Sequence, residues 1–246
     1  MTFSWHRVGA IVKKELKDYR RNRFVVILTM TVLPLVFVLL PVIQLFTIRV
    51  SEISSSKLDT RIGISLLYML IVPAIIPSAL SAYSVIGERE QGTLEPLLTT
   101  PIRSEELLVG KALAVSIPTL VVAYAIYGIF LIAVGAFANP ALQVVVFGQA
   151  HLLVELLFIP LLAGWSIWVG IAISTRSADV RVAQQLSVFA SLAPLIIVAL
   201  LALNVIKPTL VLTLLLAAGL LVLDSVGWRL VALMFDRERL IVGEPR

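Results

Sequence analysis

The residue types that usually carry catalysis are few in this sequence. It has no cysteine and two distant histidines, His6 and His151, so neither a thiol nucleophile nor a His-rich metal site is expected. Gly110-Lys111 resembles the end of a phosphate-binding loop, but Ala112 follows where that loop requires Ser or Thr. We therefore expect no cofactor and no ATP in this chain, and no motif supports an enzyme.

Polar side chains inside apolar runs are the second group that could do chemistry. The candidates are Gln44, Glu155 and Asp224, and His151 lies one helical turn from Glu155, so these two could pair. Ionisable residues within a membrane are costly and often mark a transport path. One interpretation is a polar lining of such a path. The other places His151 and Glu155 in the outer headgroup layer and Asp224 near the inner one.

The longest polar stretch between two strongly apolar runs is residues 88–111, EREQGTLEPLLTTPIRSEELLVGK. Gly92 and Thr93 should end the helix that arrives from Ala82–Glu90, because glycine is costly inside a helix and threonine is a good N-cap. Pro96 is acceptable in the first turn of a new short helix, which Thr100-Pro101 would end. The stretch therefore predicts a short helix between two longer ones.

This short helix would carry Leu94, Leu97 and Leu98 on one narrow face. An exposed leucine stripe beside a membrane indicates a protein partner, although the leucines could equally rest on lipid headgroups. Ser104 should cap the next helix, with two glutamates in its first turn, where the helix dipole favours negative charge.

Composition predicts an all-α, polytopic membrane protein. Of 246 residues, 59% are hydrophobic and 14% charged, and several apolar runs exceed 18 residues. We expect one domain over residues 1–246 with six transmembrane helices. Their ranges are 24–48, 62–86, 112–137, 152–174, 182–203 and 209–235. Two prolines, Pro73 and Pro77, should bend or locally unwind the second of them.

Residues 3–23 have the pattern of an amphipathic helix lying in the membrane interface. Lys and Arg cover one side of this helix. The apolar residues that recur at helical spacing on the other side are Trp5, Val8, Val12, Leu16 and Tyr19. The alternative is a plain basic tail that only sets orientation.

The basic residues indicate the orientation. With the N-terminus inside, 16 of the 20 Lys and Arg fall on the cytoplasmic side, so both termini and residues 88–111 should be cytoplasmic. This distribution explains the net charge of +5 without a nucleic-acid partner. The protein would be a multi-pass protein of the cytoplasmic membrane.

The 88–111 stretch resembles the signature of the ABC-2 family of exporter permeases, E-x-E-x-G-T-x-E-x-L-L-x-T-P followed by G-K. The matching residues are Glu88, Glu90, Gly92, Thr93, Glu95, Leu97, Leu98, Thr100, Pro101, Gly110 and Lys111. The resemblance implies that residues 88–111 form a cytoplasmic coupling helix and its flanks, which contact a separate ATPase. The coupling residues would be Glu88, Glu90, Gly92, Thr93, Leu94, Glu95, Leu97, Leu98, Thr100 and Pro101.

The resemblance further implies two ATPase subunits, which bind ATP and Mg²⁺, and a second permease subunit, identical or similar to this one. The direction of transport would be export. An autonomous channel or secondary carrier without an ATPase is the alternative, as is a scaffold without transport. The substrate does not follow from the sequence.

Overall fold

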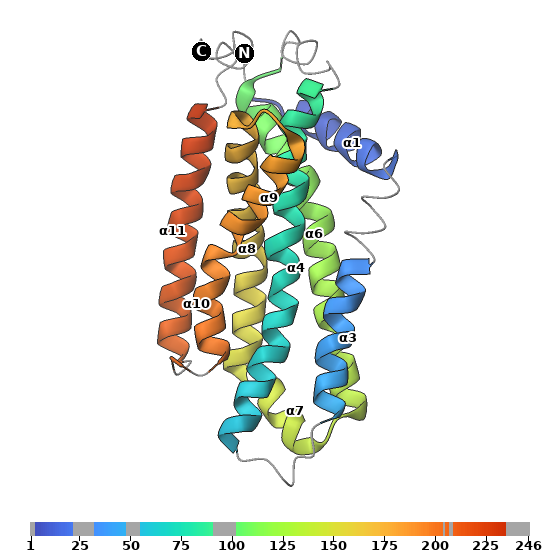
Figure 1. Cartoon of the computed structure of the whole chain (residues 1–246), viewed down its shortest axis with the longest axis vertical. Helices are drawn as coiled ribbons and strands as arrows, with labels where there is room; N and C mark the ends of the chain where they lie inside the picture. The colour runs from blue at the N-terminus through green and yellow to red at the C-terminus, as the bar shows by residue number, and fades with distance from the viewer. Residues whose placement is uncertain are drawn as a thin grey trace.

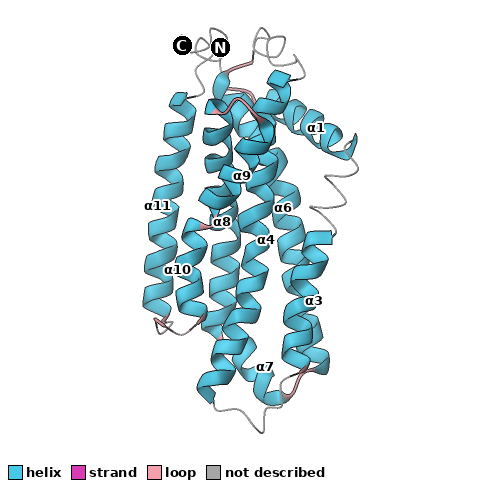
Figure 2. Ribbon diagram, viewed as in Figure 1, coloured by secondary structure: helices cyan, strands magenta, loops and turns pink. Residues whose placement is uncertain are grey.

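The computed structural model describes residues 3–21, 32–47, 55–90, 102–203, 205–206 and 209–234, and these residues form helices without a strand. The long helices run side by side as an elongated bundle, and α1 lies at one end of it (Figures 1 and 2). The helices are α1 (Trp5–Arg21), α3 (Leu33–Phe46), α4 (Ser55–Glu90), α6 (Ser104–Phe137), α7 (Pro140–Val146), α8 (Gln149–Arg176), α9 (Val180–Ser191), α10 (Ala193–Ala202) and α11 (Leu210–Met234).

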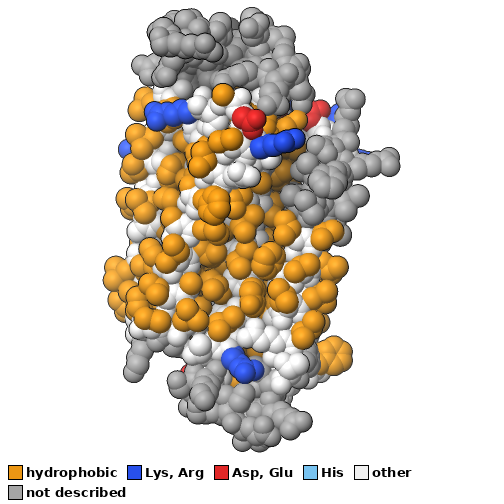
Figure 3. Space-filling model, in the orientation of Figure 1, with side chains coloured by type: hydrophobic (Ala, Val, Ile, Leu, Met, Phe, Trp, Pro, Cys, Tyr) orange, Lys and Arg blue, Asp and Glu red, His pale blue; other side chains and the backbone are white. Residues whose placement is uncertain are grey.

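Within the described residues, five stretches are long and apolar enough to cross a membrane. They are Leu58–Tyr83, Ser104–Phe137, Gln149–Arg176, Val180–Ala202 and Leu210–Met234. Figure 3 shows hydrophobic side chains over the middle of the bundle and charged ones near its ends. The all-α membrane class is therefore confirmed. The first expected span, 24–48, is described only over α3, whose apolar stretch Leu33–Leu45 is shorter than a full crossing.

The second span differs from the prediction in two ways. Helix α4 begins at Ser55, inside the loop expected before residue 62, and it is helical without interruption through Pro73 and Pro77 to Glu90. Serine side chains add hydrogen bonds to carbonyl oxygens near the two prolines. Ser81 Oγ donates to Pro77 O at 2.6 Å, and Ser166 Oγ of α8 donates to Ala74 O at 2.7 Å. The bond from Ser166 also ties this part of α4 to α8.

Two other predictions needed correction. The connection after α6 contains the helix α7, because the Asn139 side chain accepts a hydrogen bond from Ala141 N and caps it. The span expected at 182–203 consists of two helices, α9 and α10, which meet at Leu192. Pro194 follows in the first turn of α10, where proline is tolerated.

The core of the bundle is the pair α4 and α8, which have the most extensive contact in the structure. Small residues make this contact close. At Gly170 of α8, any Cβ would clash with Ser81 of α4, so glycine is required there. Close approach of helix backbones through glycine and serine is the usual way in which membrane helices associate.

Candidate functional site

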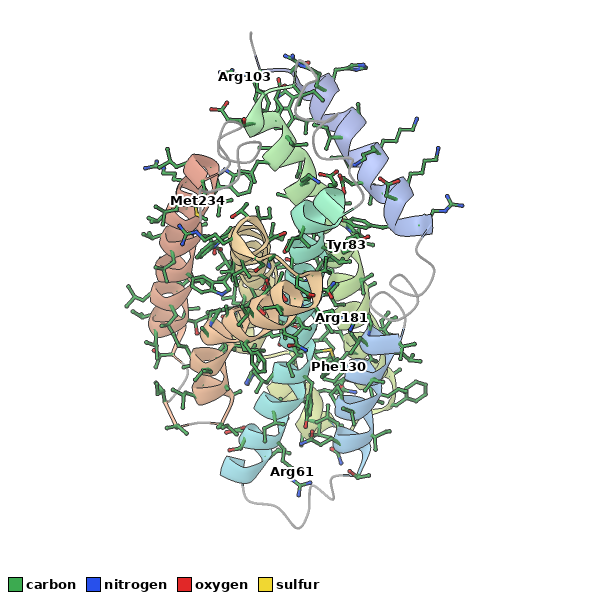
Figure 4. The ribbon with its side chains drawn as sticks, turned by 45° about the horizontal axis from the view of Figure 1, so that its top comes forward. Arg61, Tyr83, Arg103, Phe130, Arg181 and Met234 are labelled. Carbon is green, nitrogen blue, oxygen red and sulfur yellow. The ribbon has the colours of Figure 1, made fainter. Side chains whose placement is uncertain are left out.

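Most of the predicted coupling residues lie outside the described part of the chain. These are Gly92, Thr93, Leu94, Glu95, Leu97, Leu98, Thr100 and Pro101, and the side chain of Glu90 also falls outside it. The structure does describe both flanks of residues 91–101, which are the end of α4 and the start of α6. Helix α1 lies beside both flanks at the same end of the bundle (Figures 1 and 4).

Four charged side chains join α1, α4 and α6, and we call them the ion cluster: Lys14, Glu15, Glu88 and Lys111. Lys111 of α6 is 1% exposed, and its Nζ lies 3.2 Å from Glu15 Oε1 and 2.8 Å from Glu88 Oε2. Lys14 Nζ lies 2.6 Å from Glu88 Oε1 and 3.3 Å from Glu15 Oε1. Each carboxylate therefore contacts both ammonium groups, and formal charge within the cluster balances.

The surroundings keep Lys14 protonated. Burial alone would lower the pKa of Lys14, but the hydrogen bond to Glu88 and the charges of Glu15 and Glu88 outweigh it and raise that pKa above its ordinary value. Burial, and then the nearby carboxylates, raise the pKa of Tyr19, so its phenol stays neutral. The Tyr19 hydroxyl is buried and has no hydrogen-bond partner among the described residues.

A second anchor joins α1 to the start of α6. Glu106 has no exposed surface, and its carboxylate accepts hydrogen bonds from Ser4 N at 2.7 Å and Arg103 N at 3.0 Å. The Arg7 guanidinium lies 3.0 Å from the same carboxylate. The predicted cap at Ser104 was wrong, because Ser104 is already helical and Glu106 caps the helix by bonding back to Arg103.

The Gly110-Lys111 pair now has a physical explanation. A Cβ at Gly110 would lie 2.6 Å from Ile11 Cγ2, so only glycine allows α1 to approach α6 this closely. One residue further, Lys111 then reaches Glu15 of α1 and Glu88 of α4. The glycine permits the contact between the helices, and the lysine makes it specific.

The end of α4 is also held on its other side. Ser174 Oγ of α8 donates to Ala82 O and accepts from Ile86 N at 3.1 Å. Ala82 and Ile86 pack against Ala183 of α9 in a small apolar cluster. A displacement at the end of α4 would therefore act on α1, α6, α8 and α9.

The structure does not bring the polar path candidates into one site. Gln44 is half-buried in α3, whereas Asp224 of α11 accepts a hydrogen bond from Trp168 Nε1 of α8 at 3.1 Å. Glu155 of α8 is fully buried against the neighbouring helices. Its possible pair with His151 is not formed, because His151 Nδ1 lies 3.1 Å from Val145 O.

Sequence reasoning missed Glu15, Lys14 and Glu106 as anchoring residues. Glu15 lies four residues after Ile11 and seven after Val8, so it occupies the same helix face as two buried apolar residues. An acidic residue on that face was the available signal. Trp5, which was assigned to the apolar stripe, is instead 69% exposed.

Comparisons with known proteins identify the family of this chain. The profile of the ABC-2 family transporter proteins matches residues 9–218. The ABC transporter permease protein NatB of Bacillus subtilis is 41% identical over 78 residues, which are 30% of this chain and 20% of that relative. The aligned part is thus a small share of NatB. The family match covers most of the chain. It includes most of α1, both flanks of residues 91–101, four of the five apolar stretches and the start of the fifth. The chain therefore belongs to the ABC-2 family of transporter proteins.

Proposed function

We propose that this chain is the membrane-spanning permease subunit of an ABC transporter, and that a separate ATPase subunit drives it by hydrolysing ATP with Mg²⁺. The observation that carries the proposal is the ion cluster. It binds both flanks of residues 91–101 to α1 through contacts of 2.6–3.3 Å. A segment attached in this way can transmit a displacement, whereas a segment joined to the bundle only by its own chain would move alone.

Within this proposal the coupling residues divide their roles. Glu88 is turned into the subunit toward Lys14 and Lys111, so it connects the coupling segment to α1 and α6. Leu94, Leu97 and Leu98 provide the apolar contact with a groove on the ATPase. Glu90 and Glu95 supply ion pairs or helix caps at that surface.

The transport cycle follows from these connections. Closure of the ATPase dimer on ATP pushes the coupling segment, and α1, α4 and α6 respond together because the ion cluster joins them. The bundle then alternates access to a central path, and hydrolysis resets it. Two permease chains pair with two ATPase subunits, both termini are cytoplasmic, and the substrate moves outward across the cytoplasmic membrane.

The first test is purification of the tagged protein from its native membrane in mild detergent, followed by an ATPase assay. Co-purification of a subunit of ATPase size with vanadate-sensitive turnover is expected. A single chain without turnover would contradict the proposal and favour an autonomous channel or carrier.

The second test addresses the leucine stripe. Leu97→Asp places a charge in the proposed apolar contact, so ATP turnover linked to transport should be lost while the subunit still inserts. Leu97→Ile retains the apolar surface and serves as the control. Normal coupled turnover in Leu97→Asp would show that this stripe does not contact the ATPase.

A further inference from the structure

A small cavity lies between α4, α8 and α10. Its volume is ≈ 40 Å³, which is room for roughly three water molecules. Its wall is mostly aliphatic, with leucines of α4 and α10 and valines of α8 and α10. Three ionisable residues complete the wall, namely Asp59, His151 and Glu155. An apolar pocket with few polar groups is the usual form of a small-molecule site.

Glu155 is the unusual member of this wall. Its side chain has no exposed surface, and neither carboxylate oxygen has a hydrogen-bond partner among the described residues. The neighbouring His151 does not serve as that partner, because Nδ1 is directed to the backbone oxygen of Val145 at 3.1 Å. A buried, unpaired carboxyl group costs free energy, and inside a membrane it usually marks a ligand or ion path.

We propose that this cavity binds the ammonium group of a small lipophilic amine, with Glu155 as its counter-ion. An ammonium group donates charge-assisted hydrogen bonds to a carboxylate, which are stronger than neutral ones. The leucine and valine side chains around it suit the hydrocarbon part of the ligand. The Glu155 side chain turns toward the cavity when the ligand enters, since its oxygens are covered in the structure described here.

The chemistry of the wall distinguishes an amine from a metal ion. No group of three or more His, Asp or Glu residues that could hold a metal occurs within the described ranges. The cavity provides one fully buried carboxylate and an aliphatic wall, and hard metal ions require several oxygen ligands. An organic monocation needs only one counter-charge and gains from apolar contact.

This site would lie on the substrate path of the proposed transporter, and in that sense the inference rests on the proposed function. Binding itself needs no ATPase. The two proposals can therefore fail separately. If the protein bound no amine, the ATPase assay would be unaffected, and if no ATPase co-purified, amine binding could still be measured.

The experiment measures thermal unfolding of the purified chain in lipid nanodiscs by tryptophan fluorescence, with n-butylammonium chloride as the probe. Two matched probes serve as controls. Sodium chloride supplies a cation without the alkyl chain, and n-butanol supplies the alkyl chain without a charge. Of the three probes, only n-butylammonium should raise the melting temperature, and the rise should saturate. Glu155→Gln should raise the half-saturating concentration at least about tenfold. Glu105→Gln makes the same change at an exposed site in α6 and should leave the response unchanged.

Val154→Phe narrows the cavity without changing the carboxylate, and it should also weaken the response. If Glu155→Gln does not insert into the membrane, Val154→Phe still tests whether the cavity binds the amine. The proposal is overturned if n-butanol stabilises equally, if sodium chloride alone stabilises, or if n-butylammonium gives no shift. An unchanged response in the cavity variants would overturn it as well.

Discussion

Lys111 is held between carboxylates that come from two other helices, Glu15 of α1 and Glu88 of α4. A buried ion pair contributes little net stability compared with apolar packing of the same volume, but loss of one partner leaves an uncompensated charge. The value of this lysine is therefore specificity, because it determines which part of α1 faces α4. Gly110 and Glu106 contribute to the same docking through packing and capping.

Replacement of this lysine tests the cluster directly. Lys111→Met keeps the length of the side chain but leaves Glu15 and Glu88 facing each other with one cation fewer. We expect a loss of about 3 kcal/mol of stability, seen as a lower melting temperature in nanodiscs.

Lys13→Met provides the matched control, since Lys13 is exposed on α1 and lies outside the ion cluster. Adding Glu15→Gln to Lys111→Met should restore part of the stability, because it removes one of the facing charges. Equal melting temperatures for the two lysine variants would show that the ion cluster has no structural role.

At the scale of elements, α1 is the helix whose placement depends most on specific contacts. Its buried face carries Val8, Ile11 and Glu15, and it packs on α6 rather than only on lipid. The helix α4, by contrast, is held along its length by α8, α3, α9 and α10. Displacement of the coupling segment would thus reach α1 through the ion cluster and the rest of the bundle through α4.

A pair of glycine substitutions tests the docking of α1. Gly110→Ala introduces a Cβ 2.6 Å from Ile11 Cγ2 and should push α1 away from α6, at a cost of about 1–3 kcal/mol. Gly9→Ala on α1 meets nothing within 4 Å, so it should be neutral or slightly stabilising through helix propensity.

The measurement for both glycine variants is the melting temperature together with coupled ATP turnover in the purified complex. Gly110→Ala should lower both, and Gly9→Ala should lower neither. If Gly110→Ala retains wild-type coupling, close contact of α1 with α6 is not needed for transmission.

At the scale of the whole molecule, the bundle has two chemically different ends. Helix α1, the ion cluster and the start of α6 lie at one end, and the start of α4 with Arg61 lies at the other (Figure 4). The hydrophobic middle between them is the part that a bilayer would cover (Figure 3). Orientation in the membrane thus determines which end an ATPase can reach.

Cysteine labelling tests this orientation, and the absence of native cysteine makes the background clean. Arg61→Cys and Arg103→Cys each place a thiol at an exposed position, at opposite ends of the bundle. A membrane-impermeant maleimide should label Arg61→Cys in intact cells and Arg103→Cys only after permeabilisation, because basic residues favour the cytoplasmic side. The reverse pattern would place the coupling segment outside and exclude an ATPase partner there.

Much of the fold could be predicted from local properties of the chain. The first and last residues of the final three spans agree within about three residues with those expected, because apolar length and helix-terminating residues are local signals. The bond from Ser166 to the backbone of α4 beside Pro73 could not be predicted, because its donor lies far away in the sequence. The helix α7 was missed although Asn139-Pro140 is a good cap and first turn.

From the sequence alone we could predict the all-α membrane class, the later apolar spans and the membership of Glu88, Gly110 and Lys111 in a family signature. This was possible because hydropathy and motif spacing are properties of neighbouring residues. What these three residues contact depends on how the helices pack, since their partners Glu15, Lys14 and Ile11 lie in another helix. The same holds for Glu155, whose burial depends on packing between helices that are distant in sequence.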